Sequence, residues 1–170
     1  MSGTPPNHVC AGMADGQAVI KIEGPCTFSL CDRVRRWLEQ ISDTLPADIH
    51  FDLSGAERID STFAGFLVSL VTYKIETGPP RVHLIAPAAS ITKALETMSL
   101  LSLFDVCEGG GPTPGEWQTL GDTKIGPEEV ADLVIDTHEK LIQADDRNAK
   151  AFRPVVDRFR AAADRQRSSK

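Results

Sequence analysis

The residues best placed to do chemistry are the adjacent hydroxyls of Ser61 and Thr62, which follow Asp60 and precede a run of apolar residues. Such residues before an apolar run are typical of a helix start, where the first backbone N–H groups have no partner within the helix and the dipole favours negative charge. A phosphoryl group on either hydroxyl would lie at the positive end of that helix. The pattern predicts a phosphorylation site, and the alternative is that these residues serve only as helix caps.

The other reactive side chains give weaker evidence for a functional site. Neither the four cysteines nor the four histidines have the spacing of a zinc site or a redox motif. Asp52, Glu57 and Asp60 are close enough in sequence for a pair of carboxylates, but solvated turn residues fit their positions better. His138 falls among the apolar positions of a predicted helix and fits a packed side chain better than a ligand. We therefore expect no catalytic residue, no metal and no cofactor, and a protein that is not an enzyme.

The elements that must position the hydroxyl pair alternate between strand and helix. Strands are expected at 17–23, 48–53, 81–86 and 103–107, and helices at 30–45, from 61 to Gly78-Pro79-Pro80, and at 90–99. The order β-α-β-α-β-α-β predicts an α/β fold with helices packed on a mostly parallel sheet. The hydroxyl pair opens the second helix after a strand and a short acidic turn. Because this helix is apolar almost all round, we expect it to lie largely buried against the sheet.

The segment from Asp52 to Leu67 resembles the signature of the STAS family, the anti-sigma-factor antagonists. In that family a strand ending in Asp-Leu-Ser leads through a short loop to an Asp-Ser-Ser/Thr helix start that a partner kinase phosphorylates. The order of elements agrees with the family over about residues 17–107. The resemblance implies a STAS-like fold, a mostly parallel or mixed sheet packed against helices, with a C-terminal helical extension outside the common pattern.

The resemblance also implies roles for individual residues. Thr62 matches the phosphate acceptor, Ser61 a helix-start hydroxyl or secondary acceptor, and Asp60 the residue that orders the loop. A further three residues are expected either in the partner-binding surface or in the core beneath it: Phe63, Gly65 and Phe66. Phe63 stands where the family usually has a small residue, often Gly. We expect the oxygen of Thr62 to be accessible at the first turn of the helix.

The chain divides into three parts by composition. We expect a STAS-like domain at 10–108, a Gly- and Pro-rich linker at 109–124 and a C-terminal helical hairpin at 125–170, with one helix to about Ala144 and a second through Phe152 to Ala162. Two short helices cannot bury their apolar stripes alone. They should dock on the main domain, on each other, or on a second copy of the chain as a homodimer.

Charge and hydropathy narrow the classes of partner. The net charge is −6, and residues 146–170 carry 8 basic and 3 acidic side chains. An acidic body repels nucleic acid, and a short basic helix is more often a solvated face than a DNA reader. No stretch approaches the length of a membrane span, the start does not read as a signal peptide, and a cytoplasmic location with free thiols fits best.

We therefore expect a regulatory protein of a partner-switching pathway. It would bind an anti-sigma factor or serine/threonine protein kinase and be switched by phosphorylation at the second helix. The alternative is a STAS scaffold or small-ligand-binding module that acts through its C-terminal helices without phosphorylation.

Overall fold

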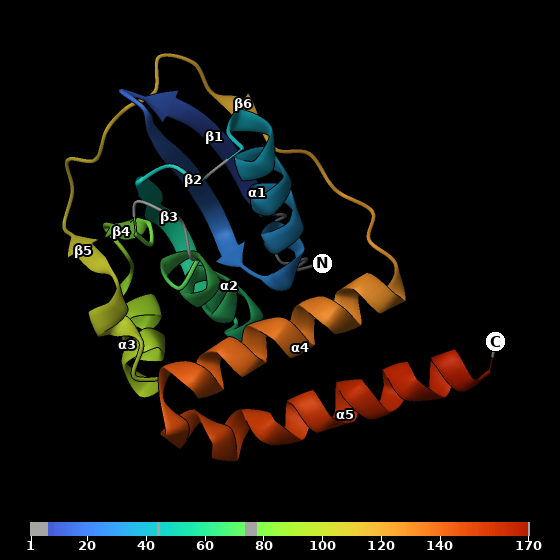
Figure 1. Ribbon diagram of the computed structural model, residues 1–170. Coiled ribbons are helices and arrows are strands. Elements are labelled where there is room, and N and C mark those ends of the chain that lie inside the picture. Colours follow the sequence, from blue (N-terminus) through green and yellow to red (C-terminus); the bar gives the residue numbers. More distant parts are fainter. Residues whose placement is uncertain (1–6, 44, 74–77, 170) are drawn as a thin grey trace, which may run out of the picture.

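The computed structural model describes residues 7–43, 45–73 and 78–169. Its main elements are β1 (His8–Ala14), β2 (Gln17–Cys26), α1 (Phe28–Ile41), β3 (Asp48–Ile59), α2 (Ser61–Val71), β4 (Arg81–Ile85), α3 (Ala89–Thr97), β5 (Asp105–Cys107), β6 (Gln118–Thr119), α4 (Pro127–Ala144) and α5 (Ala149–Ser168). Two short 3-10 helices, η1 (Leu101–Leu103) and η2 (Asp146–Asn148), precede β5 and α5. The fold is α/β, as the sequence predicts, and the C-terminal helices are present (Figure 1).

The strands form one mixed sheet in the order β5-β4-β3-β2-β1-β6. The strands β2, β3, β4 and β5 pair in parallel, which is the expected arrangement, while β1 is antiparallel to both β2 and β6. Sequence reasoning missed β1 and β6. β1 joins β2 through a tight turn at Asp15-Gly16, where both residues have positive φ angles of 51° and 78°. That Asp-Gly pair is a strong hairpin signal, and it was the clue to the missing strand.

The acidic segment before α2 is strand, and the prediction of a short turn there is wrong. β3 continues past Leu53 to Ile59, because β2 also continues and pairs Glu23 with Gly55 and Cys26 with Ile59 after a shift of register. The backbone N–H of Asp60 then donates to the carbonyl of Cys26 at 3.0 Å. α2 therefore begins directly at the end of a paired strand, with no loop between them.

The core lies between one face of the sheet and the helices. Its largest fully buried side chains are Phe51, Phe63, Ile20, Ile22, Leu30, Leu38, Ile49, Leu53, Leu67, Leu84, Ile91 and Leu95. α2 is apolar and buried along most of its length, as predicted, but it ends at Val71 rather than at Gly78-Pro79-Pro80. Residues 74–77 of that expected helix lie outside the described part of the chain. Each Å² of apolar surface removed from water contributes about 25 cal/mol, so the burial of these side chains stabilises the fold.

The C-terminal hairpin forms a further layer. α2 lies between the sheet and α4, and α5 packs on the far side of α4 (Figure 1). α4 ends at the predicted Ala144, and its first turn is capped by the side chain of Glu129, which accepts from the N–H of Gly126 at 2.8 Å. Of the three docking modes open to the hairpin, the structure shows two together: the helices pack on each other and on their own domain, through α2.

The predicted linker is partly structured. Residues 118–119 form β6, and the preceding segment packs closely on β1, because a Cβ at Gly12 would lie 2.4 Å from the carbonyl oxygen of Glu116. Residues 121–126, which lead into α4, are mostly exposed. This segment is tied to α1 by an ion pair between Asp122 and Arg33 and by a hydrogen bond from the side chain of Thr123 to Asp32.

Candidate functional site

The first turn of α2 is held by the carboxylate of Asp60. Its Oδ1 accepts from the N–H of Phe63 at 2.7 Å, which caps α2. Its Oδ2 accepts from the N–H of Phe28 at 2.9 Å, which is the first residue of α1. One acidic side chain therefore satisfies an unpaired donor at the start of each helix and places its negative charge near two positive helix ends. This contact supports the expected role of Asp60 in ordering the segment.

Ser61 is half-buried, and its hydroxyl contacts a residue 77 positions further along the chain. Its Oγ lies 2.9 Å from Nε2 of His138 on α4. The other ring nitrogen, Nδ1, lies 2.7 Å from the carbonyl oxygen of Val134. Because a carbonyl only accepts, Nδ1 carries the proton of a neutral ring and Nε2 has a free lone pair. The hydroxyl of Ser61 therefore donates to His138.

His138 is a packed side chain, as the sequence suggests. It is 3% exposed, and the ring of Phe152 from α5 meets it edge-on at 5.3 Å between centroids. Burial lowers the pKa of His138, while the hydrogen bond to Val134 and the negative charge of Asp60 act in the opposite direction. The net effect favours the neutral ring, which is the form that accepts from Ser61. Sequence reasoning did not connect this histidine with the hydroxyl pair.

Thr62 is 7% exposed, so this residue is more covered at the start of α2 than expected. α2 carries buried residues on almost every side because the sheet, α1 and α4 surround it. A single-sequence pattern places a hydroxyl at a helix start but does not show which distant element covers that start. Between the two predicted acceptors, Ser61 is the more exposed.

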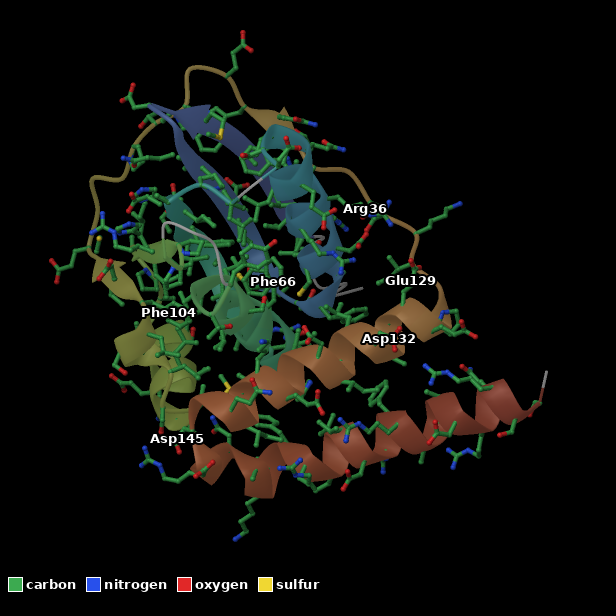
Figure 2. All side chains as sticks on the ribbon, in the orientation of Figure 1. Arg36, Phe66, Phe104, Glu129, Asp132 and Asp145 are labelled. Atoms are coloured by element: carbon green, nitrogen blue, oxygen red, sulfur yellow. The ribbon has the colours of Figure 1, made fainter. Side chains whose placement is uncertain are left out.

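The three residues expected at the partner surface or in the core take different positions. Phe63 is fully buried and meets Phe51 of β3 edge-on at 6.1 Å, so its side chain belongs to the core. Gly65 faces α4 so closely that a Cβ there would lie 2.2 Å from the carbonyl oxygen of Thr137. Phe66, labelled in Figure 2, is 5% exposed and borders a groove between α1, α2 and α4. The α2 surface at Ser61 and Gly65 is thus covered by α4.

Two of the four cysteines and the carboxylate of Asp52 occupy structural positions. Cys26 and Cys31 are buried, and burial raises the pKa of the Cys26 thiol to about 12 and that of Cys31 well above its usual range. Asp52 accepts from the N–H and hydroxyl of Ser54 and does not pair with Asp60. Within the described ranges, no group of three or more His, Cys, Asp or Glu side chains could hold a metal ion.

The sheet face away from the core carries a second polar region. His50 and His83 stack in parallel with ring centroids 4.2 Å apart, and Nε2 of His83 lies 2.7 Å from Asp48. Further along the same face, a groove of about 750 Å³ separates the sheet from the linker and is lined by residues that include Lys21, Asp52 and Trp117. This region lies on the other side of the sheet from α2.

Comparison with known proteins identifies the fold. The chain is similar to an anti-sigma factor antagonist from Mycobacterium paratuberculosis, with a TM-score of 0.51 and 16% identity over 64% of this chain and 91% of that one. It is also similar to the anti-sigma factor antagonist SpoIIAA in its unphosphorylated form, with a TM-score of 0.50 and 16% identity over 58% of this chain and 87% of that one. No protein-family model matches the chain, and no curated protein matches its sequence.

The chain therefore contains the STAS fold of the anti-sigma factor antagonists, which confirms the fold expected from residues 52–67. Both solved proteins are covered over most of their length, whereas more than a third of this chain has no counterpart in either of them. Among the helices that the structure describes, none is both long and apolar enough to cross a bilayer.

Proposed function

We propose that this protein is a regulatory protein of the anti-sigma-factor-antagonist type, which binds a partner protein through the start of α2 and is switched by phosphorylation there. The observation that carries the proposal is the Asp60-capped start of α2 with its adjacent hydroxyls, in a fold shared with two anti-sigma factor antagonists. The partner class is accordingly an anti-sigma factor or a serine/threonine protein kinase. The protein has no chemistry of its own in this proposal.

The geometry favours Ser61 over Thr62 as the first acceptor. Ser61 is half-buried and its Oγ contacts Nε2 of His138, whereas Thr62 is almost fully covered. A phosphoryl group on Ser61 would add nearly two negative charges beside the carboxylate of Asp60. It would also need the space that His138 occupies at 2.9 Å. Phosphorylation at Ser61 therefore changes the contact between α2 and α4 as well as the charge presented to a partner.

The proposal is tested by mapping phosphate on the full chain. The protein is incubated with ATP and an extract of its source cells, and modified residues are located by mass spectrometry. Phosphate at Ser61 or Thr62 supports the proposal, and Ser61→Ala and Thr62→Ala variants show which hydroxyl accepts it. An unmodified α2 in every sample, while a known kinase substrate in the same extract is phosphorylated, would exclude the switch.

The alternative is a binding module that does not depend on phosphorylation. The groove of about 750 Å³ between the sheet and the linker favours a small ligand for this alternative. A Ser61→Glu variant separates the two functions, because a carboxylate at position 61 imitates part of the phosphate charge and size. If a partner captured by the wild type binds Ser61→Glu and Thr62→Glu with the same affinity, the module is unregulated at this site.

A further inference from the structure

The outer surface of α2 is closed by a helix of the same chain. The closure includes the Ser61–His138 hydrogen bond at 2.9 Å, the approach of Gly65 to the backbone of Thr137, and the burial of Thr137 to 1% exposure. Leu141 of α4 also belongs to the apolar core of the domain. Ser61 and Gly65 lie four residues apart on α2 and therefore on one side of that helix. This side includes the hydroxyl proposed above as the phosphate acceptor.

We infer that the α4–α5 hairpin is an internal competitor that covers the partner-binding side of α2, and that the free chain is closed until the hairpin moves away. The inference rests on the proposed function for the identity of that surface. The element already bound there indicates the partner: an amphipathic helix that brings a small residue over Gly65 and a hydrogen-bond acceptor to Ser61. Because the hairpin is tethered, it competes at a high effective concentration.

The hairpin has the internal contacts of a unit that can move as one body. α4 and α5 hold each other through the His138–Phe152 ring contact, the burial of Val156, and an ion pair between Arg160 and Glu139. The mostly exposed residues 121–126 connect this unit to the sheet, and their contacts with α1, through Asp122 and Thr123, lie outside the hairpin. Separation from α2 would therefore break the α2–α4 contacts and leave those within the hairpin in place.

A second set of polar contacts holds the turn between α4 and α5 against the end of α3. The side chain of Asn148 donates to the carbonyl of Met98 at 2.8 Å and to that of Leu141 at 2.9 Å. Asp145 accepts a side-chain hydrogen bond from Ser99, and it lies at the turn between α4 and α5, beside the end of α3 (Figure 2). This end provides a pivot, so the loss of the Ser61 contact would open the α2 side first.

Substitution of Gly65 should disrupt the contact between α2 and α4 selectively. In Gly65→Ala the new methyl group meets a backbone oxygen, which cannot rotate away as a side chain can. α4 must shift, while α2 itself gains a better helix former. Gly121→Ala is the matched control, because a Cβ at Gly121 meets nothing within 4 Å.

The experiment measures access to the covered surface in the full-length chain. The half-exposed Cys10 and Cys107 are replaced by Ser, and Thr137→Cys places a thiol reporter in the α2–α4 contact. The rate of its reaction with a disulfide reagent is compared with and without Gly65→Ala. Cys26 and Cys31 are buried in the core and report global unfolding. The parent should react slowly, Gly65→Ala should react about tenfold faster or more, and Gly121→Ala should match the parent.

Two outcomes would overturn the inference. One is a reporter that reacts in the parent as fast as in the unfolded chain, and the other is a Gly65→Ala rate no higher than that of Gly121→Ala. The phosphate-mapping assay on the same variants separates this inference from the proposed function. Faster phosphorylation of Gly65→Ala supports both. If the thiol at position 137 reacts faster in Gly65→Ala but no variant carries phosphate, α4 does cover α2 and the proposed phosphorylation switch is rejected. If all variants are phosphorylated equally and the thiol reaction rate is unchanged, the inference that α4 covers the site is rejected and the phosphorylation switch is retained.

Discussion

The inner and outer sides of α2 are built from different contacts. On the inner side, Phe63 and Leu67 are fully buried in a continuous apolar core with the sheet. On the outer side, Leu141 of α4 belongs to the same apolar core, and beside it a hydroxyl meets an imidazole and a glycine meets the backbone of α4. Apolar burial is strong and insensitive to small changes of charge, whereas a few polar contacts and a close backbone approach are lost through one substitution or one modification. One helix thus carries the core on one side and, on the other, the contacts that we propose can open.

The largest expected effect tests the inner side. Phe63→Ala should lower the free energy of unfolding by about 3–5 kcal/mol, because it removes a fully buried ring and leaves a cavity beside Phe51. Urea denaturation followed by circular dichroism measures the loss. Phe152→Ala is the control on the hairpin, where the ring is only partly buried, and its effect should be smaller. Equal losses in the two variants would contradict the division between core and hairpin.

The next effect concerns Asp60, whose carboxylate caps the starts of both α1 and α2. Asp60→Ala should cost about 1–3 kcal/mol of unfolding free energy, because it leaves the N–H groups of Phe28 and Phe63 without their charged acceptor. Asp60→Asn retains one side-chain oxygen and should lose about half as much. Urea denaturation again measures both. An Ala variant as stable as the wild type would show that water replaces both hydrogen bonds.

The contrast also explains what the sequence could reveal. Asp60, the helix start and the apolar character of α2 were all recognised, because capping and periodicity are local properties of neighbouring residues. The Ser61–His138 contact was missed because it joins residues 77 positions apart through the docking of a separate helix. The sequence left that docking open among three partners. Two features were informative in retrospect: Gly65 within an otherwise apolar helix, and His138 within an apolar stripe.

The extent of the sheet was underestimated for a related reason. β1 contains small residues such as Ala11 and Gly12, whose apolar signal is weak even though Val9 and Ala11 are buried. The segment Ser54–Arg58 was interpreted as a turn from its composition, but backbone pairing with β2 keeps it extended. Strand formation at such positions depends on the neighbouring strand, which local propensity does not describe.

A smaller effect is expected on the outer side. Ser61→Ala should cost about 1 kcal/mol, because it removes one hydrogen bond and leaves Nε2 of the buried His138 without its donor. The loss should appear as faster amide hydrogen exchange in α4 before any change in the core strands. Ser69→Ala is the matched control, since the hydroxyl of Ser69 donates to the carbonyl of Phe66 within α2. If both variants exchange alike in α4, the Ser61 contact does not hold the hairpin.

The smallest expected effect is a dependence on pH that separates the outer side of α2 from the far face of the sheet. Burial lowers the pKa of His138, and burial together with the charge of His83 lowers the pKa of His50. A histidine whose pKa is lower in the folded chain takes up more protons when unfolded. Stability is therefore fully present above the unfolded pKa of about 6.5 and is lost as the pH falls below it.

Protonation of His138 would also put a proton on Nε2, so that the ring no longer accepts from Ser61. We expect the wild type to unfold at a lower urea concentration at pH 5.5 than at pH 7.5, and His138→Gln and His50→Gln each to reduce that difference. Only His138→Gln should also remove the acid-induced rise in hydrogen exchange of α4, because His50 lies on β3 and bonds to Gln17 of β2 at 2.8 Å. An equal response of α4 exchange in both variants would mean that acid loosens the whole fold rather than the contact between α2 and α4.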